Sequence, residues 1–401
     1  MNLQQRTERT GMSRIIACGF VASLLLMSLM FSACESEEII GIIDAVDDAI
    51  EAETIKIGML YSSPLPGTTR NGARLAVSEF NAAGGINGKL LVLEAEDDEN
   101  NSQNSVASVK KLIADGAVSI IGPDWSAHAL EVGPVVQAAG IPMITTYPTN
   151  PTVPKAGDFV FMGAFTDNYQ GELIAKFAAE SLSAKKAAIL TQSNLPYSEG
   201  LSTYFKDSLR ALAEGVEVLQ FFYDKGDTDF ATQLTEIAAM EPDIVFMPGF
   251  VPEVPTAIQQ AKAAGITAPF LGGDGWDNPQ LLEMGGDALE GSFFVNHFSA
   301  LPGADLGADA SHFVKVYTEK YGMPPDGPAS LGYDAVRIMI QAIQGAADMS
   351  GAAIRAQLAA TMDYSGAAML SKFDENRHAI KSGVIITIAN GALQAHQIIA
   401  P

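Results

Sequence analysis

The stretch VSIIGPDWSAHALEVGPVVQAAGIPMITT, residues 118–146, contains one complete unit of an α/β fold. A short apolar run at 118–122 leads through a loop into a segment with helical spacing, which ends in AAGI before a second apolar run at 142–146. Both runs are apolar throughout instead of alternating, which is typical of strands covered on both faces of a parallel sheet. The stretch therefore predicts a strand, a covering helix and a neighbouring parallel strand.

The same order of elements returns in DIVFMPGFVPEVPTAIQQAKAAGITAPFLGG, residues 243–273. Further strand-like runs occur at residues 55–60, 90–94 and 187–191. One shared AAGI tetrapeptide is weak support, but its place between two strand-like runs in both stretches is more specific. In a chain of 401 residues, this repetition predicts two lobes built alike.

The N-terminus has the pattern of an export signal. Basic residues precede an apolar run at residues 15–31, which ends in the sequence FSAC at Cys34. This order is typical of a secretory signal over residues 1–33, and small residues before a cysteine resemble the bacterial lipobox, in which that cysteine is lipidated. An uncleaved membrane anchor is the alternative, since the run approaches the ~20 residues that span a bilayer. Either interpretation places the rest outside the cytoplasm, with residues 34–53 as an acidic tether.

Composition excludes several classes of function. A net charge of −23 repels phosphate backbones, so nucleic acid is not expected as a partner. One of the two cysteines, Cys18, lies in the signal, so no internal disulfide is expected after cleavage. The sequence has no recognisable nucleophile, phosphate-binding or zinc motif, and the five histidines have no ligand-like spacing. We therefore expect neither an enzyme nor a metal or cofactor, and we interpret Asp97 and Asp98 as surface acids.

The loops after the predicted strands carry a pattern suited to binding. Ligands of open parallel sheets bind beyond the carboxyl ends of the strands. Ser126 comes directly before a helical segment, where its hydroxyl and the free N–H groups suit a carboxylate, although a plain helix cap is the alternative. Thr149, in the next such loop, offers a similar hydroxyl or is a turn residue.

The second half offers the opposite charge. Asp274, beside Gly275, suits a ligand ammonium group because the flanking glycines let the backbone approach closely, although an Asx-turn is the alternative. Tyr197 and Phe250 provide apolar walls or belong to the core. The two halves together predict a cleft that binds a small zwitterion.

At these residues the chain resembles the type I periplasmic binding proteins, specifically the leucine/isoleucine/valine-binding family of ABC transporters. The likeness extends from about residue 55 to 390 and rests on the order and spacing of several short motifs. They are IKIGML at 55, NGARLAVSEFNAAGGINGKLL at 71, EDDEN at 96, VSIIGP at 118, GIPMITTYPTNP at 140, YSEGL at 197, GGDGWDN at 272 and GYDAV at 332.

The resemblance implies a Venus-flytrap α/β fold, in which two Rossmann-like lobes with parallel sheets are joined by three crossovers. The first lobe is expected at residues 54–163 and 297–350, and the second at 164–296 and 351–401. It implies a monomer that captures an amino acid or analogue by hinge closure and delivers it to a membrane permease. A sensor reporting to a receptor is the alternative, and an extracytoplasmic hydrolase is a more distant one.

The resemblance also implies roles for single residues. Ser126 and Thr149 match positions that hold the ligand α-carboxylate and help to hold the ammonium, and Asp274 matches the acid that pairs with the ammonium. Tyr197 and Phe250 match aromatic positions of the second lobe. Further candidate contacts are Asp124, Trp125, Tyr147 and Trp276.

Two departures from the family pattern concern the walls of the cleft. The loop SSPLPGTTRNGAR, after Tyr61, is short and lacks the aromatic that often covers the ligand, and Ala329 falls where branched-chain binders carry a large aromatic. We therefore expect a wider pocket and an amino acid that is larger or more polar than leucine.

Overall fold

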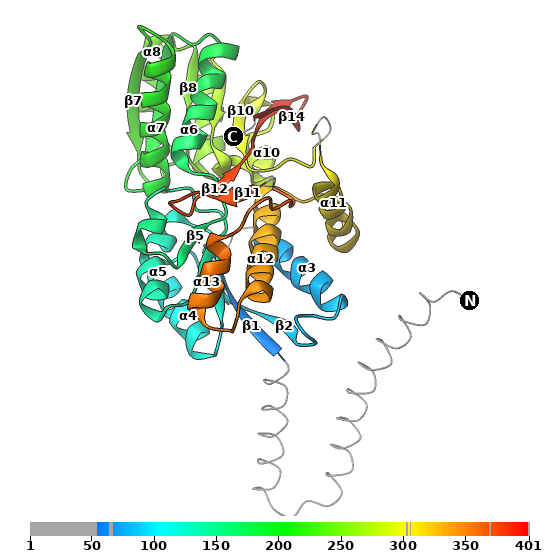
Figure 1. The fold of residues 1–401 in the computed structure, drawn as a ribbon. Helices are drawn as coiled ribbons and strands as arrows, with labels where there is room; N and C mark the ends of the chain where they lie inside the picture. The colour runs from blue at the N-terminus through cyan, green and yellow to red at the C-terminus, as the bar shows by residue number, and fades with distance from the viewer. Residues whose placement is uncertain (1–53, 64–66, 302–303, 305, 369, 400–401) are drawn as a thin grey trace, which may run out of the picture. The chain divides into compact units, whose positions relative to one another are not determined.

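The computed structural model describes residues 54–63, 67–301, 304, 306–368 and 370–399 (Figure 1). The predicted signal, the tether and the lipidation site Cys34 lie outside these residues. The predictions of two lobes and of parallel sheets are confirmed by the two large sheets described below.

The first sheet has five strands in the order β2-β1-β3-β4-β5. β3 pairs in parallel with both β1 and β4, and β4 pairs in parallel with β5. The strands are β1 (Thr54–Tyr61), β2 (Leu90–Asp97), β3 (Ser119–Ile121), β4 (Met143–Thr145) and β5 (Val160–Met162).

The second sheet has seven strands in the order β14-β13-β10-β9-β8-β6-β7. The five strands from β6 to β10 run parallel, whereas β13 and β14 form an antiparallel edge. They are β6 (Lys186–Gln192), β7 (Glu217–Tyr223), β8 (Ile244–Phe246), β9 (Phe270–Gly272), β10 (Phe293–Asn296), β13 (Gly383–Ala389) and β14 (Ala392–Ile399).

Helices cover these sheets in layers on both faces, because the strands carry apolar side chains on both faces. In β3, Ile120 and Ile121 are fully buried but belong to different hydrophobic clusters, because successive side chains point to opposite faces. In β6, Ala188 and Ile189 divide in the same way. Each sheet therefore needs an apolar cover on both faces.

The helices of the first lobe are α3 (Thr68–Ala82), α4 (Ser102–Ala114), α5 (Ser126–Ala139), α11 (Ala308–Tyr321), α12 (Gly327–Gly345) and α13 (Gly351–Ala359). Those of the second are α6 (Asp167–Lys176), α7 (Pro196–Leu212), α8 (Ala231–Met240), α9 (Glu253–Ala263) and α10 (Pro279–Gly285). Shorter helical turns are η1 (Val153–Ala156), η2 (Phe177–Ser181), η3 (Asp274–Trp276) and η4 (Gly286–Leu289). Among the described residues, no helix combines the length and the apolar character needed to span a bilayer.

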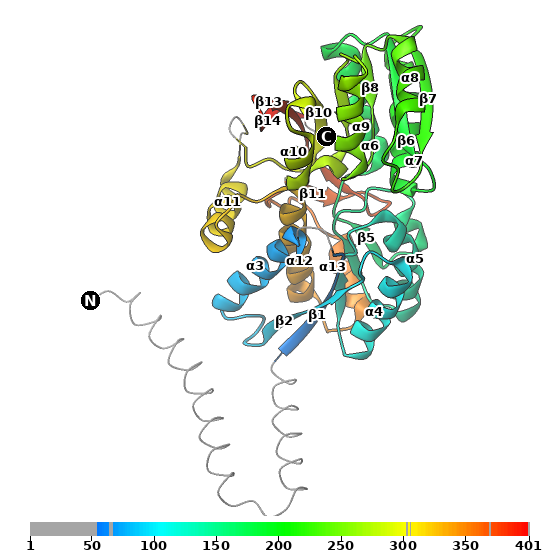
Figure 2. The same ribbon diagram turned by 180° about the vertical axis from the view of Figure 1, so that it is seen from behind.

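Helices α3 and α12 lie side by side in both ribbon views (Figures 1 and 2). Their backbones approach closely at Gly72, where a Cβ atom would lie 1.9 Å from the carbonyl oxygen of Ala329. Ala329 is fully buried in this contact, and the neighbouring Pro328 lines the cleft instead. The expectation that Ala329 leaves a gap in the cleft wall is therefore wrong, because the residue faces a helix.

The chain passes between the two sheets three times. The passages lie between β5 and α6, between β10 and α11, and between β12 (Ala379–Lys381) and β13. β12 pairs with β11 (Leu370–Phe373) in a separate two-stranded sheet. The structure differs from the predicted boundary at residue 351, since Ile354 and Leu358 of α13 are fully buried in the first-lobe core. Their apolar side chains complete the cover over α12.

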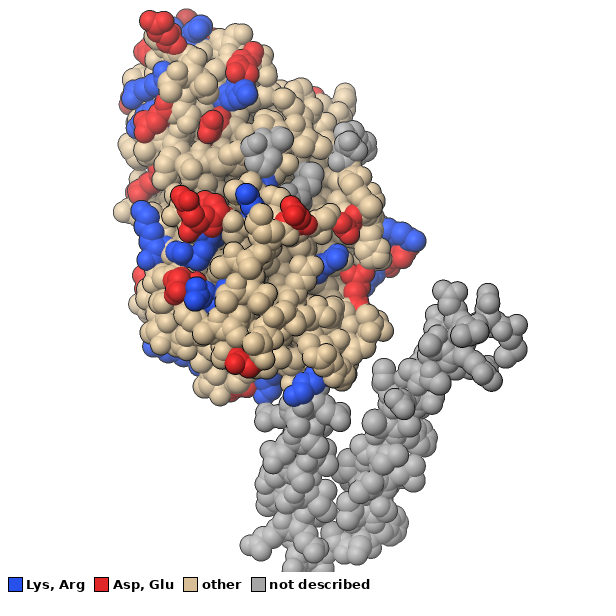
Figure 3. Space-filling view, viewed as in Figure 1, with Lys and Arg blue, Asp and Glu red and all other residues tan. Residues whose placement is uncertain are grey.

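Charged side chains are spread over the face shown in Figure 3. Acidic and basic groups alternate there without forming one large patch. The net charge of −23 is thus a property of the whole sequence rather than of one area on this face.

Candidate functional site

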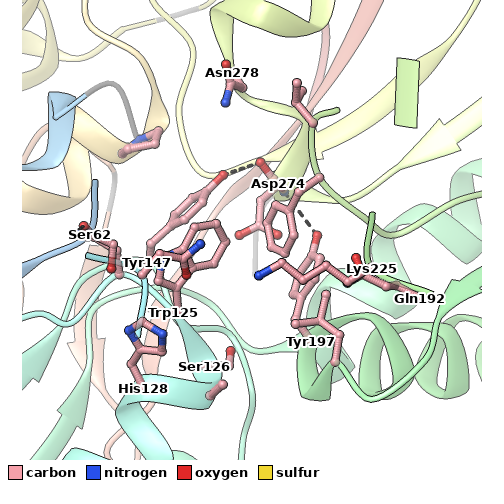
Figure 4. A pocket seen from close by; sticks show the side chains of 18 of the residues that line it. Ser62, Trp125, Ser126, His128, Tyr147, Gln192, Tyr197, Lys225, Asp274 and Asn278 are labelled. Atoms are coloured by element: carbon pink, nitrogen blue, oxygen red, sulfur yellow. Dashed lines mark hydrogen bonds between the residues drawn. The ribbon is translucent and has the colours of Figure 1, made fainter. Parts of the chain in front are cut away.

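A cavity of about 1050 Å³ lies between the loops of the two lobes (Figure 4). Its lining comes from the segments that follow the carboxyl ends of β1, β2, β3 and β4 in one lobe, and of β6, β7, β8 and β9 in the other. This is where the topology of open parallel sheets places ligands.

The cavity brings together residues that are far apart in the sequence. Nine of the ten candidate ligand contacts line it, and among them are Ser126 of the first lobe and Asp274 of the second, which share this one hollow. The nine are Asp124, Trp125, Ser126, Tyr147, Thr149, Tyr197, Phe250, Asp274 and Gly275.

Trp276 is the exception. Its side chain is 1% exposed and its Nε1 donates to the carbonyl of Met247 at 3.0 Å. The ring packs against Gly272, where a Cβ would lie 2.2 Å from the indole. The prediction that Trp276 contacts ligand is wrong, because its ring fills the second-lobe core.

The N-terminus of α5 opens into the cavity. Trp125 precedes the helix in an extended conformation, and Ser126 is the first helical residue instead of the predicted cap. Ser126 makes no capping hydrogen bond; its Oγ accepts from the backbone N–H of Asn150 at 3.4 Å. The first N–H groups of a helix have no intrahelical partner, so this end of α5 suits an anion.

Asp274 presents one oxygen to its protein partner and keeps the other unpartnered. His297 Nε2 lies 2.8 Å from Oδ2, whereas Oδ1 is buried without a hydrogen-bond partner among the described residues. Burial, followed by the charge of Lys381, lowers the pKa of His297 to about 4, so its imidazole is neutral at pH 7. A neutral imidazole N–H donates to Oδ2 and leaves Oδ1 for a cation.

The backbone around Asp274 is held by two of the candidate contacts, Tyr147 and Tyr197, and by Gln170, which the sequence did not single out. Gln170 Oε1 accepts from the Asp274 N–H at 2.7 Å, and Tyr147 donates its hydroxyl to the Asp274 carbonyl. Tyr197 accepts from the N–H of Gly275 at 3.1 Å. Tyr147 belongs to the first lobe, so its bond links the two sides of the cleft. Gln170 contacts Asp274 only in the folded chain, so no local sequence motif identifies it.

Aromatic rings close one side of the cavity. Trp125 meets Phe250 edge to face, with centroids 4.7 Å apart, and Phe250 stacks on Tyr197 at 5.0 Å. The first contact joins a loop of one lobe to a loop of the other. The indole Nε1 of Trp125 is buried without a hydrogen-bond partner in the described part of the chain.

Several buried acids around the cleft are protonated more readily than usual. Burial raises the pKa of Asp124 to about 6, although Thr146 donates to it at 2.8 Å. Burial also raises the pKa of Asp167 well above its ordinary value, and neither of its carboxylate oxygens has a hydrogen-bond partner among the described residues. The backbone carbonyl of Thr149 accepts from the backbone N–H of Asp167 at 2.7 Å. This bond connects the first lobe to the start of α6.

A second acidic pair lies where α12 begins. Burial raises the pKa values of both Asp277 and Asp326, the latter to about 7. The negative charge of Asp274 further raises the pKa of Asp277, and that of Asp277 further raises the pKa of Asp326. Asp277 accepts from the N–H of Gly327 at 2.7 Å, and Asp326 caps α12 by accepting from the N–H of Ala329 at 2.9 Å. The pair connects the second-lobe loop to a first-lobe helix.

The interpretation of Asp98 as a surface acid is wrong. Its side chain is fully buried and accepts from Ser62 Oγ at 2.6 Å and from Ser105 Oγ at 2.8 Å. Its Oδ2 also lies 2.7 Å from Nδ1 of His128, a cavity residue that the sequence did not reveal. Because 30 residues separate this His–Asp pair in the chain, its spacing carries no signal.

The described residues hold no group of three or more His, Cys, Asp or Glu side chains arranged for a metal ion. What they assemble is a cleft with hydrogen-bond donors for an anion on one side and a carboxylate oxygen for a cation on the other. The two sides are joined by aromatic rings and by the Tyr147 bond.

Comparisons with known proteins agree with this geometry. A family profile described as "Periplasmic binding protein" matches residues 54–392. The Leu/Ile/Val-binding protein BraC3 of Rhizobium johnstonii is 32% identical over 265 residues, which cover 64% of this chain and 71% of that protein.

Two solved structures share the fold. A leucine binding protein LivK from Thermotoga maritima superposes with a TM-score of 0.82 at 32% identity, covering 87% of this chain and 99% of its own. The branched-chain amino acid transporter substrate binding protein LivJ from Streptococcus pneumoniae, in complex with isoleucine, superposes with a TM-score of 0.80 at 29% identity, covering 87% and 100%.

Proposed function

The chain belongs to the periplasmic binding protein family, and we propose that it captures an amino acid between its two lobes and delivers it to the permease of an ABC transporter. Members of this family bind solutes, so the captured molecule leaves the cleft chemically unchanged. The observation that carries the proposal is the shared cavity of Ser126 and Asp274.

The two ends of an amino acid match the two sides of this cavity. The α-carboxylate binds at the N-terminus of α5, where the Ser126 hydroxyl and free N–H groups supply donors. The α-ammonium binds Asp274 Oδ1, which is buried and unpartnered among the described residues. A ligand with only one of these charges would leave the other side without a partner.

Burial makes this double match necessary. A charge taken from water into a closed cleft needs several charge-assisted hydrogen bonds to offset its lost hydration. Closure of two lobes around a ligand provides bonds from both sides at once. We propose that ligand first binds the first lobe and that the second lobe then brings Asp274 to the ammonium.

The lining favours a side chain that is larger or more polar than leucine. Amide, hydroxyl and amine groups surround the outer part of the cavity, and Figure 4 shows Lys225, Gln192 and Asn278 around it. Lys225 is exposed and makes no hydrogen bond or ion pair with another described residue, which leaves its ammonium for a polar ligand group. An aliphatic side chain would leave these groups to water.

Delivery to a permease is favoured over sensing. The LivJ relative is described as a transporter substrate binding protein, and BraC3 as a Leu/Ile/Val-binding protein. We further propose an exported lipoprotein attached through Cys34, because the FSAC sequence follows an apolar run with basic residues before it. Mass spectrometry of the N-terminal peptide from the native host would detect the lipid.

Calorimetry of the purified protein against the twenty standard amino acids tests the proposal. We expect at least one amino acid to bind, and its amide and its des-amino analogue to bind far more weakly. Mass spectrometry of the recovered solute should find it unchanged. Absence of binding by every amino acid, or equal affinity for the des-amino analogue, would contradict the proposal.

A further inference from the structure

His128 is the third residue of α5 and lines the same cavity as Ser126. The residue is 5% exposed. Nδ1 lies 2.7 Å from Asp98 Oδ2 and 3.0 Å from Ser105 Oγ. The imidazole is therefore held on one edge by a buried carboxylate.

The state of Asp98 determines which nitrogen carries the proton. Burial alone would raise the pKa of Asp98, but hydrogen bonds from His128, Ser62 and Ser105 lower it below the ordinary value. An ionised carboxylate only accepts hydrogen bonds, so His128 donates to it through Nδ1–H. Proton uptake by the ring must then occur at Nε2.

His128 lines the cavity, and its Nε2 has no hydrogen-bond partner among the described residues. The hydrogen bonds of His128 within the described chain involve Nδ1, and Nε2 is not among the buried unsatisfied atoms, so it remains accessible. Side chains in a helix lean toward its N-terminus, which directs this ring toward the first turn of α5. Figure 4 shows His128 on the same side of the cavity as Ser126.

We propose that His128 is a ligand-contacting residue that takes up a proton at Nε2 when a carboxylate binds at the N-terminus of α5. The Nε2–H then donates to that carboxylate, and the positive charge of the ring is balanced by Asp98 on its other edge. Capture of the amino acid is thereby linked to proton uptake. This inference rests on the proposed function, because the amino acid supplies the carboxylate.

The other charged groups around the ring are few. Asp98 follows β2, Asp124 follows β3, and α4 contributes the uncharged Ser105. Lys225 enters the cavity from the second lobe. Asp124 is the rival source of a proton effect, since burial raises its pKa to about 6.

The test measures protons directly. The probe is the standard amino acid that most raises the melting temperature of the wild-type protein, titrated by calorimetry at pH 7.5 in phosphate and in Tris, which differ in ionisation enthalpy. We expect the binding heat to depend on the buffer with the sign of proton uptake, by up to about one proton per ligand. We expect this dependence to disappear in His128→Gln and to persist in Asp124→Asn.

Affinity provides a second readout. His128→Gln should weaken binding by about tenfold at pH 6 and by much less at pH 8.5, because only the protonated ring donates from Nε2. His312→Gln is the matched control, since His312 also pairs with a carboxylate, Glu79 at 2.8 Å, but on the surface. That variant should match the wild type at both pH values.

The possible outcomes distinguish failure of the proton-uptake inference from failure of the proposed function. If the probe binds wild-type protein with the same heat in both buffers, the inference is wrong and the proposed function stands, a result that does not depend on whether His128→Gln folds. Loss of proton uptake in Asp124→Asn instead of His128→Gln would also overturn it. If no amino acid stabilises the protein, the proposed function fails and takes this inference with it.

Discussion

Each lobe holds one buried His–Asp pair beside the cleft, and the two pairs face the cavity with opposite members. In the first lobe, Asp98 is fully buried with several donors, and its partner His128 lines the cavity. In the second pair, His297 follows β10 and is fully buried, and its partner Asp274, of the second lobe, lines the cavity with an Oδ1 that has no hydrogen-bond partner in the described part of the chain.

The difference between the pairs matches the two ends of an amino acid. The first pair offers an imidazole beside a helix N-terminus, which suits a carboxylate, and the second offers a carboxylate, which suits an ammonium. The same two residue types thus suit ligand groups of opposite charge, because the histidine lines the cavity in the first pair and the aspartate lines it in the second. The following predictions test this contrast, beginning with the largest expected effect.

Removing the acid of the second pair should have the largest effect. Asp274→Ala is expected to weaken binding of the best amino acid by about 2–5 kcal/mol, because it leaves the ammonium buried without a partner. Calorimetry measures the change, and Asp207→Ala, at an exposed position of α7, serves as the control. An unchanged affinity in Asp274→Ala would remove the second pair from the recognition scheme.

A buried lysine, Lys381, lies close enough to the second pair to affect its charges. Its Nζ is buried with no hydrogen-bond partner in the described chain, and burial lowers its pKa to about 7. Because the ordinary pKa is 10.5, the unfolded state binds more protons than the folded state between these values. The free energy of unfolding should therefore rise with pH across pH 7.5–9, by up to about 1.4 kcal/mol per pH unit, and fall as pH drops toward 7.

Urea unfolding at several pH values measures this slope. Lys381→Met should reduce it by the contribution of one group, whereas Lys315→Met, at an exposed position of α11, should leave it unchanged. An identical slope in wild type and Lys381→Met would mean that the lysine is hydrated in the folded protein.

Removing the hydroxyl beside the first pair should have the smallest effect. Ser126→Ala is expected to weaken amino acid binding by about 0.5–1.5 kcal/mol, because the hydroxyl is neutral and the helix N–H groups remain. Calorimetry at pH 7 checks it, with Ser181→Ala as an exposed control. A loss as large as that of Asp274→Ala would show that the first lobe depends on this side chain more than on its backbone.

The sequence predicted the sheets well because buried parallel strands read as apolar runs. All seven predicted runs coincide with strands, among them β1, β3 and β6. The antiparallel edge formed by β13 and β14 was not predicted. Its pairing joins the end of the chain to β10, and a contact of that kind depends on the fold rather than on local pattern.

The candidate site was predicted in part for a similar reason. Residues directly after strands, such as Ser126 and Asp274, lie at the carboxyl edges of the two sheets, and both edges line the one cavity. Trp276 follows the same strand as Asp274 but turns into the core. Two residues so close in sequence differ in direction, and only packing against Gly272 decides it.

The amino-acid sequence by itself determined the family, the alternation of strands and helices, and the loops that form the cleft, since these depend on local periodicity and on residues near one another in the chain. Only the tertiary structure decided which acids are buried, which member of each His–Asp pair lines the cavity, and that α13 completes the first lobe. The physical reason is that burial and pairing join residues far apart in the chain, so the environment of a charge exists only after folding.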